Sequence, residues 1–84
     1  MGLTIKEREK REKEQWLKAF GVHMRKTRMK KEMKPAELAR RAFMERSNIA
    51  RLEMGRMNPT LYMLKKLSEA LDITIQEFLE DFDA

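Results

Sequence analysis

The chain has 84 residues and a formal net charge of +5, with 42% hydrophobic and 39% charged residues, so it can form one modest core in one small domain. It contains no cysteine, which excludes disulfides and thiolate metal sites and fits a reducing cytoplasm. We find no apolar run long enough for a membrane span, no signal peptide and no β-type alternation, so the sequence favours an all-α protein with no membrane partner.

The charges are distributed unevenly along the chain. Residues 1–56 hold 17 Lys and Arg against 8 Asp and Glu, whereas residues 57–84 hold 2 against 6. A basic front and an acidic back suit a protein that presents one face to phosphates. An ordinary solvated surface with a chance bias would give the same counts.

Residues 1–15 form a highly charged stretch without an apolar face. Glu7 and Arg11, and likewise Glu9 and Lys13, have the i,i+4 spacing that supports a helix, but nothing apolar follows Ile5 until Trp16. We therefore expect a frayed, solvent-exposed helical extension. A basic arm that lies along DNA is the alternative, and the alternating charges weaken it.

The next helix carries an apolar stripe followed by a basic end. Its predicted core positions are Trp16, Leu17, Phe20, Met24 and Thr27. His23 has neither a cysteine nor a second histidine to join it in a metal or catalytic site, so we expect it on the surface. Cations suit a helix C-terminus, but Lys34 stands at the start of the following helix, where a facing phosphate would offset the unfavourable charge.

Residues 35–59 predict two short helices joined by a tight turn. Leu38, Ala39 and Ala42 form one buried stripe, and Ile49 and Leu52, with Met44 less clearly, face the same core. Gly55 can adopt the positive φ that ends the second helix, and Asn58-Pro59 blocks its continuation. This is the plan of a helix-turn-helix, in which the second helix enters the DNA major groove.

Two further helices follow. The first, from about Thr60 to Leu71, places Leu61, Leu64, Leu67 and Leu71 on one predicted core face. Thr74 can cap the last helix, which has four apolar residues in its length: Ile75, Phe78, Leu79 and Phe82. They exceed what one small core needs, so they either close the core or also pack against a second copy.

These marks together resemble the Cro/repressor-type helix-turn-helix family, the xenobiotic-response-element-type regulators of bacteria and phages. The matching features are Leu38-Ala39, Ile49, the Leu52-Glu53-x-Gly55 ending, Asn58-Pro59 and the spacing of Leu64, Leu67 and Leu71, with Arg25-x-x-Arg28 upstream. The resemblance covers residues 20–82. It implies a five-helix lambda-repressor-like DNA-binding domain over residues 16–84, preceded by the charged helical extension of residues 1–15.

The resemblance also implies roles for individual residues. The exposed face of the second motif helix would contact bases through Glu45, Arg46, Ser47, Asn48 and Arg51. Phosphates would be bound by Arg28, Lys34, Arg56, Asn58 and Thr60. Arg28 would pair with Glu53, and a two-fold interface would use Ile75, Phe78, Leu79 and Phe82. Glu45 and Thr60 have a second possible role, since each can serve its helix as an N-terminal cap.

Three positions depart from the family pattern. Pro35 follows Lys34 where a Gln that bonds the DNA backbone is usual, and proline has no N–H to donate. Phe43 occupies the turn position that commonly holds glycine, so either the turn is reshaped or the ring packs well enough to offset about 1–2 kcal/mol of strain. Glu32 likewise replaces a glycine at the end of the preceding helix.

We therefore expect a sequence-specific regulator that binds double-stranded DNA as a homodimer in the cytoplasm of a bacterium, encoded by that bacterium or by a phage. The alternative is a protein-interaction module or an antitoxin-like protein on the same fold, with weak DNA binding. With one histidine, no cysteine and no glycine-rich phosphate loop, the sequence predicts no enzyme activity, cofactor, metal or small-molecule ligand.

Overall fold

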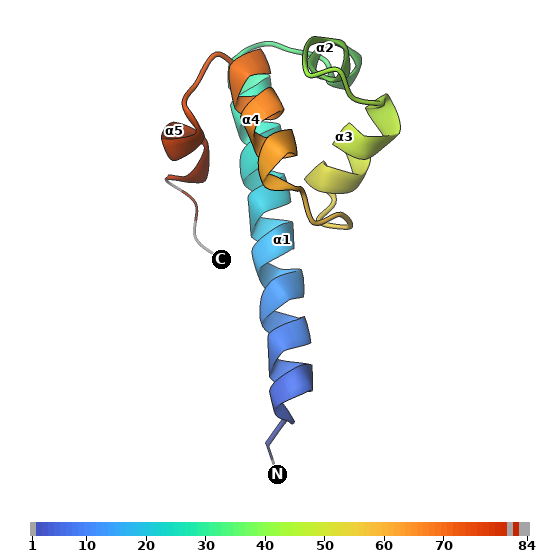
Figure 1. Ribbon diagram of the computed structural model, residues 1–84, viewed down its shortest axis with the longest axis vertical. Coiled ribbons are helices and arrows are strands. Elements are labelled where there is room, and N and C mark those ends of the chain that lie inside the picture. The colour runs from blue at the N-terminus through green and yellow to red at the C-terminus, as the bar shows by residue number, and fades with distance from the viewer. Residues whose placement is uncertain (1, 81, 83–84) are drawn as a thin grey trace.

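The computed structural model describes residues 2–80 and 82, and these residues form five helices joined by loops (Figure 1). In chain order the helices are α1 (Ile5–Lys30), α2 (Pro35–Arg41), α3 (Arg46–Glu53), α4 (Leu61–Ala70) and α5 (Ile75–Leu79). The predicted all-α class is confirmed. Among the described residues, no helix combines the length and the apolar character needed to cross a membrane.

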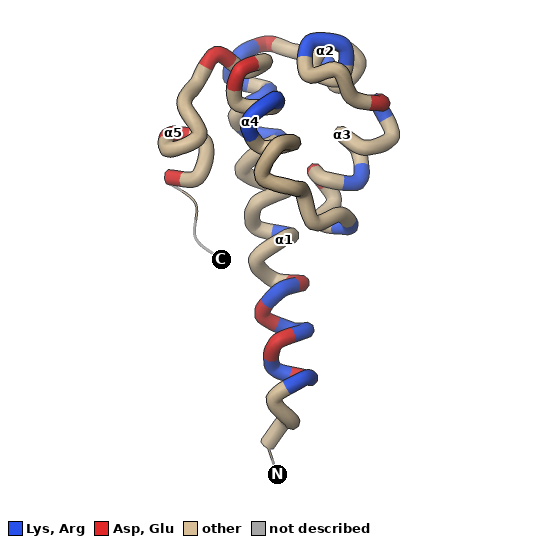
Figure 2. The backbone as a smooth tube through the Cα atoms, viewed as in Figure 1, with Lys and Arg blue, Asp and Glu red and all other residues tan. Residues whose placement is uncertain are grey.

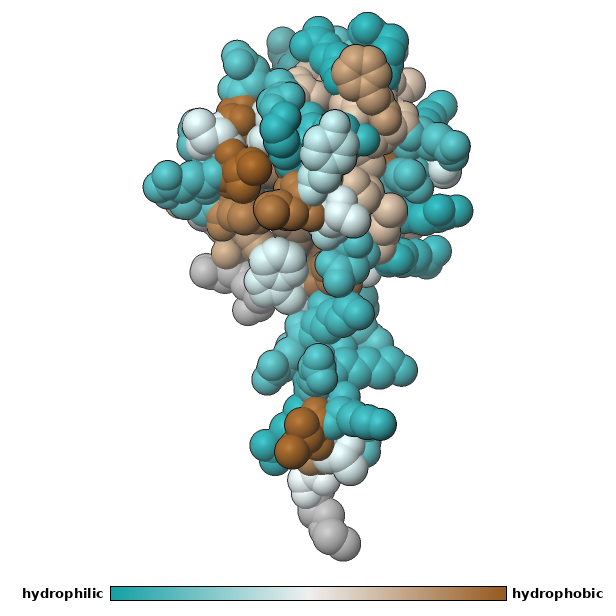
Figure 3. All heavy atoms as spheres, viewed as in Figure 1, coloured by the Kyte–Doolittle hydropathy of each residue, from teal (hydrophilic) through white to brown (hydrophobic). Residues whose placement is uncertain are grey.

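The long helix α1 is the axis of the molecule. Thr4 caps it by accepting a hydrogen bond from the Glu7 amide at 3.2 Å, and the helix then runs unbroken for 26 residues. Its second half lies among the other helices, whereas its first half projects away from them and carries almost only hydrophilic side chains (Figures 1 and 3). The predicted ion pairs from Glu7 and Glu9 to Arg11 and Lys13 do not form: the ion pairs of the described residues lie elsewhere, as Arg28–Glu53, Arg41–Glu37 and Lys65–Glu69.

The core lies where the five helices meet. Its largest fully buried side chains are Phe20, Phe78, Met24, Leu38, Ile49, Leu52, Leu67 and Leu71. Met44 packs against this cluster, as predicted. Leu61 was predicted to join it but is 74% exposed, although Met63 and Leu64 of the same turn pack against the core. The helical turn of about 3.6 residues points Leu61 away from the side of α4 that carries Leu67 and Leu71. Trp16 was also expected in the core and is half-exposed, stacked on Phe20.

A close approach between α1 and α3 depends on Gly21. A Cβ atom at this position would lie 2.5 Å from the carbonyl oxygen of Glu53 and 2.6 Å from that of Leu52, which is far inside van der Waals contact. No pattern in the sequence singles out Gly21. Ala39 of α2 is another small buried residue, but Gly21 is the residue that allows the backbone of α3 to rest on α1.

An aromatic cluster attaches α5 to α1. The ring of Phe20 lies 5.3 Å from that of Phe78 and 5.8 Å from that of Phe82, measured between centroids. His23 stacks on Phe82 at 5.0 Å, and its Nε2 lies 2.6 Å from the carbonyl oxygen of Phe78. The prediction that His23 is a surface residue is therefore wrong: it is half-buried because it joins the two helices.

The same cluster changes the predicted two-fold interface. Phe78 is fully buried in the core of its own chain, so it has no surface to offer a second copy. Phe82 is partly buried against Trp16, Phe20 and His23 and is likewise occupied within the chain. Of the four predicted interface residues, Leu79 is 39% exposed and Ile75 is partly exposed.

Among residues 2–80 and 82, three residues other than glycine adopt the left-handed conformation, and each lies just after a helix. They are Glu32 at φ 54°, Phe43 at φ 53° and Asp72 at φ 56°. Phe43 is the most unusual because its side chain is 87% exposed. The turn is therefore not reshaped to avoid positive φ, and burial of the ring does not compensate for the strain, so neither expected explanation for Phe43 is correct.

Replacing Phe43 with glycine is expected to stabilise the protein by about 1 kcal/mol. Relief of about 1–2 kcal/mol of left-handed strain outweighs the additional backbone entropy that glycine loses on folding. Thermal unfolding monitored by circular dichroism should show the melting temperature rising by about 4–8 °C. The control is Phe43→Ala, which removes the ring and keeps the Cβ atom. An equal rise in both variants would show that the exposed ring, and not the backbone conformation, is the source of the instability.

Candidate nucleic-acid interface

The two helices of the predicted motif are held by a short buried seam. Four apolar side chains of this seam are at most 1% exposed: Leu38 of α2, Ala42 directly after it, and Ile49 and Leu52 of α3. Helices α2 and α3 therefore share one core face. The turn between them is closed by a hydrogen bond from the Met44 amide to the carbonyl oxygen of Ala39, at 2.9 Å. The remaining face of α3 is consequently directed toward solvent.

That outer face carries the predicted base-contacting side chains. Glu45, Arg46, Ser47 and Arg51 are exposed, and Asn48 is partly exposed. Glu45 occupies the N-cap position of α3, but its side chain makes no capping hydrogen bond. The Ser47 hydroxyl lies 3.5 Å from the Glu45 carboxylate, and a nitrogen of Arg51 lies 3.4 Å from the Asn48 side-chain oxygen. These contacts are long, so the polar groups are available for other partners.

The start of α2 lies beside this face. Lys34 is exposed at the N-cap of α2 without a capping hydrogen bond, and Pro35 follows as the first helical residue. Arg25 of α1 and Arg46 of α3 line a hollow of about 250 Å³ together with Pro35. Three cationic side chains from three different elements therefore surround the start of α2.

A buried ion pair connects α1 to α3 behind this surface. The Nε atom of Arg28 donates to one carboxylate oxygen of Glu53 at 2.7 Å, and a terminal nitrogen donates to the other at 2.9 Å. The remaining terminal nitrogen donates to the carbonyl oxygen of Met33 at 2.8 Å. The hydrogen bond to Glu53 raises the pKa of Arg28 above its ordinary value, because it stabilises the charged guanidinium.

This arrangement separates the two roles predicted for Arg28. The ion pair with Glu53 is present as predicted. The predicted contact with a phosphate is not supported, since Arg28 is 8% exposed and all three of its guanidinium nitrogens are hydrogen-bonded within the protein. Arg28 is therefore a structural residue of the motif.

The loop after α3 holds the other predicted phosphate contacts. Gly55 has φ 72°, and a Cβ atom there would lie 2.7 Å from the Cα of Lys18, so only glycine fits where this loop passes α1. Arg56 and Asn58 are exposed beyond it. Thr60 caps α4 by accepting from the Met63 amide at 3.0 Å, which is its alternative role, and its hydroxyl hydrogen remains able to donate.

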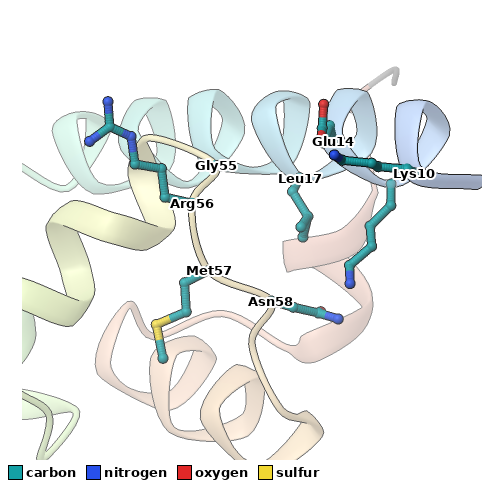
Figure 4. A pocket seen from close by; sticks show the side chains of 8 residues that line it. Lys10, Glu14, Leu17, Gly55, Arg56, Met57 and Asn58 are labelled. Carbon is teal, nitrogen blue, oxygen red and sulfur yellow. The ribbon is translucent and has the colours of Figure 1, made fainter. Parts of the chain in front are cut away.

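Helix α1 brings two further cations to this loop. Lys10 and Lys13 line a groove together with Gly55, Arg56 and Asn58 (Figure 4). In the sequence these lysines belong to a highly charged stretch in which basic and acidic residues alternate. Their i,i+3 spacing places them on one side of a helix, but only the packing of the loop against α1 shows which side faces the loop.

The backbone view shows how the charges are grouped. Basic segments lie on α2, on α3 and in the loop after it, whereas acidic segments mark α5 and the turn before it (Figure 2). The projecting half of α1 carries both signs (Figure 2). The basic front and acidic back of the sequence thus become two regions of the molecule, with the motif helices in the basic one.

Comparison with known proteins identifies the same motif. The family model described as helix-turn-helix matches residues 24–78. The crystal structure of the restriction-modification controller protein C.AhdI from Aeromonas hydrophila is 33% identical, with a TM-score of 0.73, over 75% of this chain and 96% of that one. The clp gene regulator ClgR from Corynebacterium glutamicum is 26% identical, with a TM-score of 0.70, over 74% of this chain and 80% of that one.

A third solved structure is also similar. The hypothetical transcription factor NHTF from Neisseria is 31% identical, with a TM-score of 0.70, over 79% of this chain and 77% of that one. No curated protein sequence matches the chain. The residues matched by the family model include both motif helices, and the predicted family resemblance and fold are confirmed.

Removing one partner of the Arg28–Glu53 pair is expected to destabilise the protein by about 3–5 kcal/mol. Arg28→Met leaves the Glu53 carboxylate buried without its partner, and the Met33 carbonyl loses a donor. Urea unfolding of Arg28→Met, Glu53→Leu and the double variant measures the coupling between the two residues. We expect the double variant to be more stable than Arg28→Met. Strictly additive losses would show that the pair makes no specific contribution.

Proposed function

This chain belongs to the helix-turn-helix family of DNA-binding transcriptional regulators, and on that premise we propose that it reads a specific operator with the outer face of α3. The observation that carries the proposal is the exposure of Arg46, Ser47 and Arg51 on a helix whose inner face is fixed by the Arg28–Glu53 pair. Arginine can bond bidentately to guanine O6 and N7, and asparagine to adenine N6 and N7. Glu45 and Asn48 complete the proposed reading surface.

Phosphate contacts on two sides hold α3 in the groove. Lys34 at the start of α2 binds one strand, and Arg56, Asn58 and the Thr60 hydroxyl bind the other. All four residues are exposed, and neither Lys34 nor Arg56 makes an ion pair within the described part of the chain. DNA therefore has an anchor on each side of the helix that reads it.

We further propose that the protein acts as a homodimer on a pseudo-palindromic site. Small regulators of this plan pair two half-sites about one helical turn apart, so that each copy places its reading helix in the major groove. The surface we assign to the contact includes Ile75 and Leu79 of α5, which remain at least partly exposed in the single chain. A regulator of this kind works in the cytoplasm, on bacterial or phage DNA.

A second candidate function is a protein-interaction module with weak DNA binding. The 87% exposed ring of Phe43 favours it, because this large apolar side chain stands at the motif turn without a partner in its own chain. Pro35 favours it too, since it cannot donate to a phosphate from the start of α2. An antitoxin-like protein would combine such a protein contact with DNA binding.

Selection from a randomised duplex pool at two salt concentrations tests the proposal. Enrichment of a palindrome is the expected result, and the distance between its half-sites gives the dimer geometry directly. If binding is weak, unselective and lost at the higher salt, operator reading is overturned and the interaction module becomes the better account.

Arg46→Ala and Arg51→Ala are each expected to weaken binding to the selected operator by about 1–3 kcal/mol and to relax the preference at one base position. The measurement is competition between the operator and single-base variants of it. Lys34→Ala is the control, because loss of a phosphate contact should weaken all sequences alike. An unchanged base preference in both arginine variants would mean that α3 does not read the sequence.

Leu79→Asp is expected to shift sedimentation toward the monomer, because a carboxylate would have to be buried in the proposed interface. Leu61→Asp serves as the matched control, since Leu61 is equally apolar and 74% exposed but lies at the start of α4. If only Leu61→Asp dissociates the protein, the interface lies on α4 and not on α5. Thermal unfolding checks that both variants remain folded.

A further inference from the structure

A groove separates the projecting half of α1 from the loop that follows α3. It has a volume of about 330 Å³, with Lys10, Lys13, Glu14 and Leu17 of α1 among its lining residues. Opposite them is the chain from Gly55 to Asn58 (Figure 4). The groove exists because Gly55 lets the loop pass directly over the backbone of Lys18. The projecting helix therefore leaves the body of the molecule at the loop that we assign to phosphate binding.

Three lysines follow one side of the projecting helix. Lys6, Lys10 and Lys13 are spaced i, i+4 and i+7, and Leu17, which is buried against the body, continues the same side. We call these three lysines the lysine edge. They also line a second, adjoining hollow of about 230 Å³ with Glu9. The edge thus runs outward from the loop along α1.

The charges of the lysine edge are not neutralised within the protein. All three lysines are exposed, and among residues 2–80 and 82 every ion pair lies outside the first half of α1. The acidic residues of this stretch lie on other sides of the helix or beside the edge, as Glu14 does at the base of the groove. Glu14 opposes an anion there, so the surface available to anions is the lysine edge and not the groove floor.

We propose that the lysine edge and the loop from Gly55 to Asn58 form one continuous surface that binds the DNA backbone flanking the operator. The inference rests on the proposed function, because the loop must face phosphates for the edge to meet the same strand. Residues 5–16 extend about 18 Å at the rise of an α-helix, which is the length of about five base pairs of duplex. The projecting half of α1 continues the buried half as one unbroken helix, so its lysines extend the footprint at fixed helical spacing.

The test compares two double variants that remove the same charge from opposite sides of α1. Lys10→Gln/Lys13→Gln changes the lysine edge, and Arg8→Gln/Arg11→Gln is the matched control on the far side. Glutamine keeps the helix propensity of both residues, so circular dichroism should show equal helix content in all three proteins. Affinity is measured across a salt series for the selected operator with flanking duplex, and for the same operator trimmed to the bases that α3 contacts.

On the flanked duplex we expect the lysine variant to show a salt slope shallower by about 1.8, the value for two lost phosphate contacts. Between about 50 and 200 mM salt, its affinity should consequently fall about tenfold less than that of the unmodified protein. The arginine variant should match the unmodified protein, and all three should agree on the trimmed duplex.

The outcomes separate this inference from the proposed function. Equal changes in both double variants, or no change in either, would overturn the role of the lysine edge while leaving operator reading intact. Should the pool yield no operator, the same series on a duplex of random sequence still reports the phosphate contacts, and a lysine-specific change there would support the edge without sequence reading. Failure of the unmodified protein to bind any duplex would overturn both proposals.

Discussion

The contact between α1 and α3 determines where the outer face of α3 points. Two features set it: the absence of a side chain at Gly21, which lets the carbonyl groups of Leu52 and Glu53 approach α1, and the bidentate pair between Arg28 and Glu53. A buried ion pair adds little net stability because desolvation offsets much of its attraction, but it tolerates few geometries. In this protein the pair fixes the angle and register of α3, while apolar packing supplies most of the stability.

The division of labour among cations follows from that contact. Arg28 is buried and hydrogen-bonded within the protein, so it is not available to a phosphate. The exposed cations at the edges of the motif, such as Lys34 and Arg56, are the ones that can bind phosphates. The helix starts show a related difference. Threonine side chains cap α1, α4 and α5, whereas Lys34 and Glu45 at the starts of α2 and α3 make no capping bond. Helix α3 therefore begins with amide groups that other acceptors can reach, whereas α2 begins with Pro35, which has no amide hydrogen.

Local patterns predicted most of this fold because they act over one or two helical turns. The helix periods, the Gly55 turn, the Thr60 and Thr74 caps and the Arg28–Glu53 pair, the last by resemblance, are all present. The errors concern which side of a helix meets its neighbours. Leu61 points away from the side of α4 that packs on the core, and the ring of His23 hydrogen-bonds to the carbonyl of Phe78, 55 residues away.

The candidate site was predicted residue by residue but not as a surface. Periodicity places Arg46, Ser47 and Arg51 on the outer side of a helix, and the structure agrees. The position of Lys10 and Lys13 against the loop after α3 depends on the path of that loop, which no spacing in the sequence reveals. The strain at Phe43, in contrast, was predictable, because a residue other than glycine stands at the turn position. The structure keeps the positive φ there, and the exposed ring gains no burial to offset it.

The attachment of α5 has a consequence for local unfolding. A helix of five residues is far too short to persist alone, so its order depends on Phe78 and on the contact of His23 with its backbone. Elements of this kind open at a lower free energy than the rest of a domain. Amides of α5 should therefore exchange with solvent deuterium sooner than those of α3 and the buried half of α1, and local opening of α5 would expose its backbone to a protease.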